Sequence, residues 1–519
     1  MKKYKFLFVI STLAIITMLF LGANINTKRE EKKQLTSQNS PIHDPMKNSS
    51  WKEKYPRQYE TWVSAKDSSV WEDEIEQKPS LAIVGAGSGG PTGPRLLGIR
   101  SHYYSIVDFL TMADSGIPNK HGEDKTTTRC LLCHSSATPE LMKRDGEVNF
   151  LTSTWTKYGS EALNPIGCAN CLDPETMKLR VSLAWVNRGL LDAGKPAFEN
   201  QPHQEKRNLV CAQCHLKIYT EQVPIMNENG KEVIARISNP LWKNGFTLDN
   251  MEDFYNNGEN FRSGKPYYDW INPLSKTPII SANYPEYELF KQGTHGKNNV
   301  ACADCHMPYK QDGGVKFTDH KVGNPLTAID RTCQTCHRKS EADLRNAVLE
   351  KKQRKDALAN TALKNIALAH LEAKKAWESG ATEAEMSSVL ADIRSAQFKW
   401  NSLYRGAYFH APEQTLSALG DSINKAQRAR LNIASILAKH GVTNYVAPTY
   451  SSKKEAFALL SLPQKDEAIE AKCESIEQVV AEWGKISKEK DTYDKDIVYP
   501  PNLNTWHTKE CNKPLHLFN

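Results

Sequence analysis

The chain carries four copies of the pattern Cys-x-x-Cys-His and a fifth copy in which the histidine is absent. The complete copies end at His134, His215, His306 and His337, and the incomplete copy reads Cys168-Ala-Asn-Cys171-Leu172. Two thiols at this spacing can form thioethers to the vinyl groups of a c-type haem, and the adjacent imidazole can bind the iron. The repetition predicts a multihaem cytochrome c.

Each copy supplies two predicted haem attachment points, which are Cys130, Cys133, Cys168, Cys171, Cys211, Cys214, Cys302, Cys305, Cys333 and Cys336. The four histidines that end the complete copies are the predicted proximal iron ligands. Leucine does not bind iron, so the sequence leaves open whether the incomplete copy carries a haem.

Other uses of paired cysteines fit this chain less well. A structural zinc ion takes two such pairs around one tetrahedral centre and does not need histidine at the next position. Disulfide frameworks belong to short secreted domains, whereas 519 residues can bury a large core. A thioredoxin-like pair occurs once, in a strand–helix–strand unit. Cys473 and Cys511 lie outside the pattern, and the sequence does not decide whether they pair with each other or stay free.

Residues 1–23 have the order of a secretory signal. Three lysines are followed by an apolar run from Phe6 to Leu21 and then by Gly-Ala. The run is also close to the lower limit for an uncleaved membrane anchor. Either alternative predicts an extracytoplasmic or periplasmic protein, which is where bacteria attach c-type haem.

The charge balance argues against a nucleic-acid partner. The formal net charge is +7, and it falls to about +4 once the three leader lysines are removed. No basic stripe interleaved with aromatic residues follows. Beyond residue 30, no apolar stretch approaches the length of a membrane span.

The composition divides the rest of the chain into four regions. Residues 24–50 are predicted to be a polar tether. Residues 51–340 are rich in Gly, Pro and Asn and hold the cysteine patterns, so we expect haem faces to complete their core. Residues 341–445 are rich in Ala, Leu, Lys and Glu, and residues 446–519 form a C-terminal tail without an informative pattern. The predicted fold is mostly α, with a Gly/Pro-rich haem-binding region and a long antiparallel helical region.

Helix-end signals support the long helices. Gly380 can end one helix in the left-handed conformation, and Thr382-Glu-Ala-Glu385 reads as a capping box that opens the next. Apolar residues at spacings of three and four predict amphipathic helices. His370 and His440 lie on these helices and are predicted to be ordinary structural residues.

A glycine-rich segment before the first cysteine pair resembles a dinucleotide-binding fingerprint. The strand-like run 81–84 precedes Gly85-Ala-Gly87-Ser-Gly89-Gly90. Pro91 and Pro94 exclude the helix that must follow such a fingerprint, and no ribose-binding acid follows at the expected distance. The segment is therefore predicted to be a glycine-rich turn.

Several longer segments resemble the ammonia-forming cytochrome c nitrite reductases, the pentahaem cytochrome c-552 family. The resemblance covers roughly residues 51–445. The segments that carry it are Leu274-Ser-Lys-Thr-Pro278, His295-Gly-Lys-Asn-Asn-Val300, Cys302-Ala-Asp-Cys-His-Met-Pro308, Thr318-Asp-His-Lys321, Gly380-Ala-Thr-Glu-Ala-Glu-Met386 and Phe409-His-Ala-Pro-Glu413.

The resemblance implies a mostly helical subunit that reduces nitrite to ammonium with six electrons. It implies four distal histidines on the far faces of bis-histidine haems, namely His102, His295, His320 and His410. It also implies electrons from a cytochrome or a membrane quinol dehydrogenase, nitrite or a related N-oxide as substrate, and a homodimer formed through the long helices.

The chain departs from the family pattern where the family places its chemistry. The family's first motif usually ends in lysine and here ends in His134, which still binds iron. The substrate-side arginine of the family is replaced by Asp114, whose charge would repel nitrite. At about 5 Å and an effective dielectric of about 20, one such charge is worth roughly 3 kcal/mol.

Two further segments change the proton-handling groups and the calcium ligands of the family. Lys217 replaces a calcium-binding glutamate and cannot bind calcium, although its ammonium group is able to occupy the position of the cation. Ile218 replaces the active tyrosine. Tyr284 replaces the active histidine, and Asn283 replaces a longer amide that binds calcium. Calcium is therefore left open.

No catalytic residue carries over from the family with these substitutions. The sequence predicts an exported multihaem cytochrome of this family whose nitrite reduction is impaired by Asp114, Leu172, Lys217, Ile218 and Tyr284. The alternative is an electron-transfer cytochrome without nitrite reductase activity.

Overall fold

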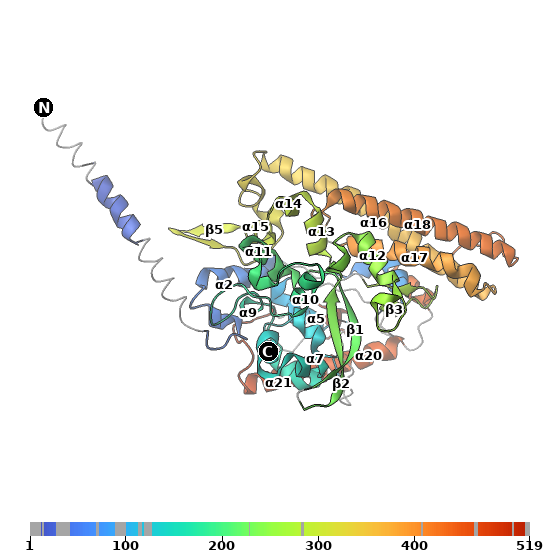
Figure 1. Cartoon of the computed structure of the whole chain (residues 1–519), viewed down its shortest axis with the longest axis horizontal. Coiled ribbons are helices and arrows are strands. Elements are labelled where there is room, and N and C mark those ends of the chain that lie inside the picture. The colour runs from blue at the N-terminus through green and yellow to red at the C-terminus, as the bar shows by residue number, and fades with distance from the viewer. Residues whose placement is uncertain are drawn as a thin grey trace.

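The computed structural model describes residues 12, 15–26, 42–68, 72–88, 100–112, 117–118, 127–227, 229–281, 285–405, 408–460, 465–500 and 503–513. Most of the ordered chain is helical, as the sequence predicts, with short helices around the cysteine motifs and three long helices beside them (Figure 1). The described part of the leader, residues 15–26, is helical and exposes its apolar side chains. Within the described ranges, no helix is both long enough and apolar enough to cross a bilayer.

The part of the chain that holds the cysteine motifs, called the haem-motif region below, is built from short helices joined by turns. Its α-helices are α2 (Pro56–Val63), α3 (Glu74–Gln77), α4 (Ser80–Val84), α5 (Ser105–Leu110), α6 (Thr138–Asp145), α7 (Glu147–Thr152), α8 (Trp155–Tyr158), α9 (Cys168–Cys171), α10 (Trp185–Asp192), α11 (His203–Ala212), α12 (Leu248–Asn256), α13 (Glu286–Gln292), α14 (Thr294–Lys297) and α15 (Cys302–His306).

Single 3-10 turns connect these helices. They are η1 (Asn48–Trp51), η2 (Ser64–Ser68), η4 (His102–Tyr104), η5 (Thr128–Cys133), η6 (Gly159–Glu161), η7 (Phe198–Asn200), η8 (Trp242–Asn244), η9 (Gly258–Asn260), η10 (Pro325–Ala328) and η11 (Cys333–Thr335). The buried part of the chain includes residues before 51, since Asn48 in η1 is fully buried, as is Trp51 in the same turn.

Three antiparallel hairpins complete this region. They pair β1 (Ile218–Met226) with β2 (Glu232–Pro240), β3 (Trp270–Ile271) with β4 (Pro278–Ile279), and β5 (Tyr309–Asp312) with β6 (Val315–Thr318). The β1–β2 hairpin projects from the body in Figure 1 and begins directly after the third cysteine motif.

The three long helices form an antiparallel bundle that extends away from the motifs (Figure 1). They are α16 (Glu341–Glu378), α17 (Glu383–Leu403) and α18 (Pro412–Lys439). The predicted helix ends are confirmed, since Gly380 has a φ of 93° and Thr382 and Glu385 form the reciprocal capping box. Buried alanines on α16, such as Ala362 and Ala369, let the helices approach closely.

His370 ties the bundle to the haem-motif region. Its ring is fully buried on α16, with Nε2 2.7 Å from Gln397 Oε1 on α17 and Nδ1 2.7 Å from Ser275 Oγ. The Gln397 amide also donates to the carbonyl of Val84. A series of hydrogen bonds through His370 and Gln397 therefore connects the bundle core to the haem-motif region, and each buried polar group in it has a partner.

The run 81–84 is helical rather than strand-like. It lies in α4, which packs its buried side chains against α16. A helix at this position lacks the strand–turn–helix geometry of a dinucleotide site, so the prediction of a strand there is wrong, although the rejection of nucleotide binding did not depend on it. Gly87 has a φ of 87°, and a Cβ there would lie 2.8 Å from the Ile271 carbonyl oxygen.

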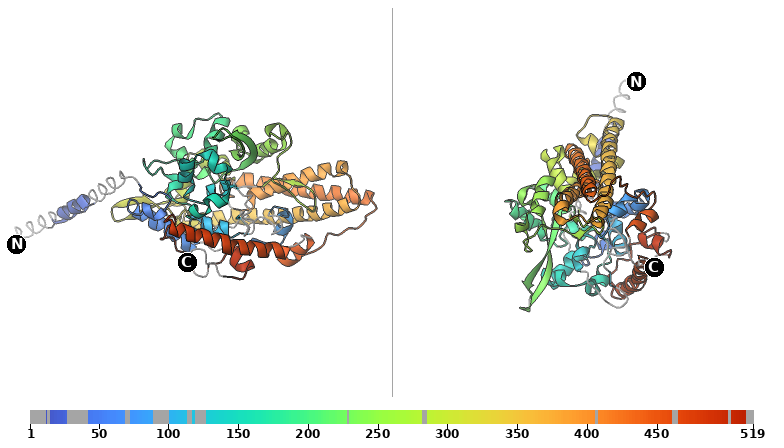
Figure 2. Two further views of the ribbon diagram at one scale, coloured as in Figure 1. Left: turned by 90° about the horizontal axis from the view of Figure 1, so that it is seen from below. Right: turned by 90° about the vertical axis from the view of Figure 1, so that its right-hand side faces the viewer.

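The C-terminal region folds back along the haem-motif region. It contains α19 (Lys453–Leu459), α20 (Lys465–Ser475), the π-helical turn η12 (Ile476–Val480), α21 (Ala481–Glu489) and α22 (Trp506–Glu510). The left view of Figure 2 shows α20 and α21 as one long red rod beside the body. Trp483 in this rod packs 6.3 Å from Trp155, which is next to the first motif.

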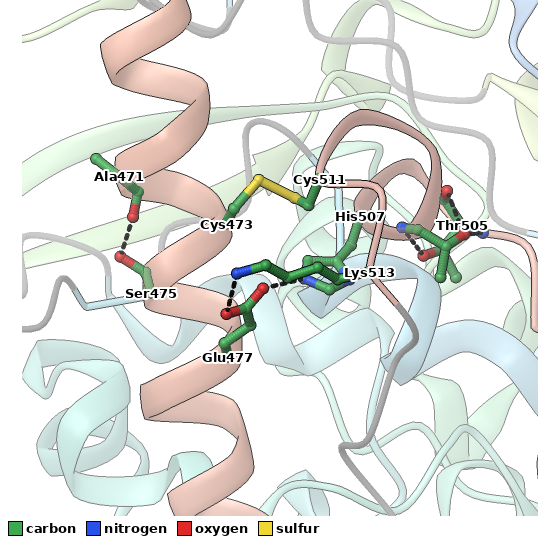
Figure 3. Close-up of a disulfide and its surroundings, with 9 residues drawn as sticks. Ala471, Cys473, Ser475, Glu477, Thr505, His507, Cys511 and Lys513 are labelled. Atoms are coloured by element: carbon green, nitrogen blue, oxygen red, sulfur yellow. Dashed lines mark hydrogen bonds and ion pairs between the residues drawn. A yellow bond between two sulfur atoms is a disulfide. The ribbon is translucent and has the colours of Figure 1, made fainter.

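Cys473 and Cys511 form a disulfide that closes this region on itself (Figure 3). The bond joins α20 to the residue after α22. Beside it, Glu477 accepts from the Lys513 ammonium at 2.9 Å and lies 3.6 Å from the buried His507 ring. The structure thus decides between the two alternatives that the sequence left for this cysteine pair.

Candidate haem centres

Three of the four predicted distal histidines face the histidine of one cysteine motif each. The ring centroids are 6.4 Å apart for His102 and His215, 6.1 Å for His295 and His337, and 6.2 Å for His306 and His410. Two imidazoles on opposite sides of one iron, each nitrogen about 2 Å from the metal, place their centroids about 6 Å apart. The three pairs fit the two axial positions of three haems.

Hydrogen bonds at Nδ1 leave Nε2 available as the metal-binding nitrogen. His306 Nδ1 lies 3.0 Å from the Gly323 carbonyl oxygen, and His320 Nδ1 lies 2.8 Å from the Thr318 carbonyl oxygen. A carbonyl can only accept, so each Nδ1 carries the proton and Nε2 keeps its lone pair.

Burial favours the neutral form of three predicted histidine ligands. It lowers the pKa of His102, His134 and His410 to about 4. It also raises the pKa of the Cys168 and Cys171 thiols to about 12. Neutral imidazoles are the metal-binding form, and un-ionised thiols do not favour a zinc-thiolate site.

His320 is the fourth predicted distal histidine. It contacts helix α2, which also contacts the segment just before the incomplete motif. Its backbone N–H donates to Thr61 Oγ1 on α2 at 2.9 Å. The next residue of α2, Trp62, donates from Nε1 to the Ile166 carbonyl oxygen at 3.0 Å, two residues before Cys168. Helix α2 therefore lies between His320 and the Cys168–Leu172 segment, which we call the Leu172 motif.

His134 has a different environment from the other motif histidines. Its ring stacks on Phe109 of α5, with centroids 4.0 Å apart and planes 7° apart. The Ser105 hydroxyl donates to the His134 carbonyl oxygen at 2.8 Å, which fixes α5 against the motif. In the described part of the chain, none of the predicted distal histidines is paired with His134.

The motifs are joined to one another through residues within them or next to them. The Asn170 amide donates to the Ser135 carbonyl oxygen at 3.0 Å, and the Gln213 amide donates to the Asn170 carbonyl oxygen at 2.8 Å. The Cys302 N–H donates to Asn208 Oδ1 at 2.8 Å. These bonds connect the first motif to the Leu172 motif, that motif to the third, and the third to the fourth.

Thiols of different motifs also lie in contact. Cys133 of the first motif interacts with Cys214 of the third, and Cys211 of the third interacts with Cys302 of the fourth. The motifs therefore form a connected array with the third motif at its branching point.

Lys217 is fully buried directly after the third motif. Its Nζ donates to the Ser281 carbonyl oxygen and lies 5.5 Å from the ring centroid of Tyr255. Its backbone N–H donates to Glu288 Oε1 at 2.9 Å. Burial lowers the pKa of Lys217 and raises that of Glu288, each to about 7.

The other departures are only partly described. Ile218 opens β1 and is partly buried. Its alkyl side chain has no proton to donate. Asp114, Asn283 and Tyr284 lie outside the described residues. Within the described residues, no group of three or more His, Cys, Asp or Glu side chains could hold a metal ion.

Sequence reasoning missed two acids beside the third motif, of which Glu288 is fully buried and Glu286 is partly buried. Glu288 is fully buried between Lys217 and the Trp242 indole, which donates to it at 2.8 Å. Glu286 Oε2 lies 3.9 Å from His215 Nδ1, and burial raises the pKa of Glu286 to about 8. Both follow Pro285 in a segment that reads as an exposed acidic helix start, so the sequence carries no signal of their burial.

Comparison with known proteins agrees with the array of motifs. The model of the cytochrome c552 family matches residues 47–492. The chain belongs to the cytochrome c552 family. The cytochrome c-552 of Aliarcobacter butzleri is 43% identical over 499 residues, which are 95% of this chain and 97% of that protein. The cytochrome c-552 of Maridesulfovibrio salexigens is 39% identical over 489 residues, which are 93% and 95% of the two chains.

A solved structure shares the fold of this cytochrome c552. It is the catalytic subunit of the cytochrome c nitrite reductase of Desulfovibrio desulfuricans, a structure described for its two calcium sites. The TM-score is 0.64 and the identity 26%, with 75% of this chain and 86% of the other covered. The resemblance seen in the sequence is thereby confirmed, and with it a haem-binding oxidoreductase scaffold.

Proposed function

We propose that this chain is an exported multihaem cytochrome that carries electrons to the iron beside His134 and reduces nitrite poorly. The observation that carries the proposal is the set of three histidine pairs, each joining one cysteine motif to a distant histidine at the spacing of a bis-histidine haem. Bound haem supplies one-electron redox chemistry and, where a coordination position is open, a site for a small ligand.

The described side chains support one assignment of the haem ligands. His102 and His215 hold one haem, His306 and His410 a second, and His295 and His337 a third. His320 serves the Leu172 motif, and His134 alone holds the first-motif haem, with its stacked neighbour Phe109 fixing the ring. The hydrogen bonds that join neighbouring motifs would hold their haems close to one another for electron transfer.

Export to the periplasm is supported by two independent features. The leader has the order of a secretory signal. The Cys473–Cys511 disulfide is of a kind that persists in oxidising compartments and is rare in the cytosol. The leader acts either as a cleaved signal or as an anchor.

The impairment is proposed from the substitutions around the substrate position. Asp114 brings a negative charge where an anion must bind, and Ile218 and Tyr284 supply no general acid near neutral pH. Lys217 is a tethered amine whose Nζ donates to the Ser281 carbonyl, and its pKa of about 7 leaves it partly protonated near neutral pH. We propose that this ammonium group takes the role of the calcium ion described for the Desulfovibrio enzyme.

The partners follow from the family. A periplasmic cytochrome or a membrane quinol dehydrogenase would supply electrons, and nitrite or a related N-oxide is the substrate of the residual activity. A homodimer would form along α16–α18. The second candidate function, an electron-transfer cytochrome without nitrite reductase activity, is favoured by the same substitutions, since they leave the paired histidines intact.

Nitrite reduction driven by reduced methyl viologen tests the proposal on the exported holoprotein. We expect activity near background, and a rise when Asp114→Arg, Ile218→Tyr and Tyr284→His are combined. Asp253→Arg on the exposed side of α12 is the matched charge control and should change nothing. High activity in the unmodified chain would reject the impairment, and wholly low-spin ferric spectra would support the carrier alternative.

A further inference from the structure

The Leu172 motif keeps the backbone turn of the complete motifs. In the third motif the His215 N–H donates to the Cys211 carbonyl oxygen at 3.0 Å, and in the last motif the His337 N–H donates to Cys333 at 2.9 Å. The Leu172 N–H makes the same bond to the Cys168 carbonyl oxygen, also at 2.9 Å. The leucine thus stands at the histidine position of an otherwise equivalent turn.

This turn is held rigidly in place. The Cys168 N–H donates to Asn48 Oδ1 at 3.3 Å, and the Arg180 guanidinium donates to the Ala169 carbonyl oxygen at 2.7 Å. A Cβ at Gly167 would lie 1.7 Å from Asn48 Oδ1, so glycine is required there. A motif that had lost its cofactor would not need this framework, and its two thiols keep the conformation of an attachment site.

The imidazole available to this haem is that of His320. The other three predicted distal histidines are each paired with a complete motif. His320 carries its proton on Nδ1, bonded to the Thr318 carbonyl, and α2 connects it to the residues before Cys168. One protein ligand is therefore present for an iron that has two axial positions.

The surroundings of Leu172 are apolar. Leu172, Tyr55, Cys168 and Met177 pack against a small cluster whose buried members are Ile42, Trp51 and Ala169. An anion such as nitrite would lose its hydration on entering this cluster. A neutral diatomic molecule pays no such cost and needs no hydrogen-bond donor.

We propose that the haem of the Leu172 motif is attached, is held by His320 alone, and offers on its Leu172 side an apolar binding position for a small neutral diatomic ligand such as carbon monoxide or nitric oxide. This inference rests on the haem array of the proposed function. It gives the chain a second ligand-binding iron, separate from the one beside His134.

Carbon monoxide titration of the reduced, exported holoprotein tests the inference after its intact mass has been measured. We expect five haem masses and two molecules of carbon monoxide bound per chain. Leu172→His supplies the missing imidazole and should lower the number by one. Leu172→Ala is the matched control, since it removes the same side chain without adding a ligand, and it should leave the number unchanged.

Each other result has a defined meaning. A mass of four haems, or an equal carbon monoxide count in the unmodified chain and Leu172→His, overturns the inference while leaving the proposed function standing. The inference is also overturned if Met177→Leu binds one more molecule of carbon monoxide than the unmodified chain, because the Met177 thioether would then be the second iron ligand. A protein without any haem would instead reject the proposed function itself.

The ferric spectrum gives a second readout that does not depend on added ligand. The high-spin signal of the unmodified chain should correspond to two irons, and that of Leu172→His to one. A signal of one iron in both proteins contradicts an open position at Leu172.

Discussion

The imidazole rings of His306 and His410 lie 6.2 Å apart with their planes at 83°, although one ends a cysteine motif and the other lies just before the long helix α18. His295 and His337 repeat this relationship at 88°, again across separate segments. Such pairs connect the start of the helical bundle to the motifs. The pairing of the haem ligands therefore depends on how the helical bundle packs against the haem-motif region, and not only on the motifs themselves.

Removing His410 should open one further iron. His410→Ala leaves the fourth-motif haem with His306 as its one protein ligand, so the reduced protein should bind one more molecule of carbon monoxide than the unmodified chain. His440→Ala is the control, because His440 lies outside the motifs and bonds to Glu385 at 3.1 Å. An unchanged count in His410→Ala would contradict the assigned ligand pair.

Calcium removal should not affect the unmodified chain. Lys217 already places a cation against the Ser281 carbonyl, with Asp269 and Glu288 nearby. We expect the same Tm with and without a calcium chelator. Lys217→Glu adds a carboxylate to these oxygens, which are the ligands that calcium prefers, so its Tm should rise with added calcium. Lys217→Gln controls for the loss of the ammonium group and should show no calcium dependence.

Breaking the disulfide should release the C-terminal region before the rest of the protein. The two cysteines are separated by 38 residues, and closing a loop of that length is worth up to about 4 kcal/mol in the chain-entropy model. In the double variant Cys473→Ser and Cys511→Ser, limited proteolysis should cut within residues 465–513 first. Ser475→Ala, which removes only a helix-internal bond shown in Figure 3, should resist as the unmodified chain does. Equal resistance of all three proteins would show that the packing of Trp483 holds this region without the disulfide.

The buried His370 should make the stability of the helical bundle fall in acid. Burial lowers its pKa from 6.5 to about 4, so the folded protein keeps this ring neutral while the unfolded chain takes up a proton below about pH 6.5. The stabilisation is complete above pH 6.5 and is lost as the pH falls toward 4, by about 3 kcal/mol in total. His370→Gln should lower the stability at neutral pH and flatten its decline between pH 6.5 and 4 in thermal unfolding. An equally steep decline in the variant would show that other groups cause it.

The chemistry of the motifs and the ends of the long helices can be predicted from short stretches of sequence. Cys-x-x-Cys-His is local, because the thiols and the imidazole belong to one turn, and a capping box such as Thr382–Glu385 is equally local. For the same reason the absence of histidine at Leu172 was evident without a structure.

Which histidine faces which motif depends on the folded chain, because the paired residues are far apart in the sequence and no local rule links them. The same holds for the Cys473–Cys511 disulfide and for the burial of Lys217 and Glu288 beside the third motif. Residues 81–84 show the same limit, since a short apolar run fits a strand or a helix equally well until packing against α16 selects the helix. Burial and long-range pairing arise from packing of the whole chain, and a single residue's type does not encode them.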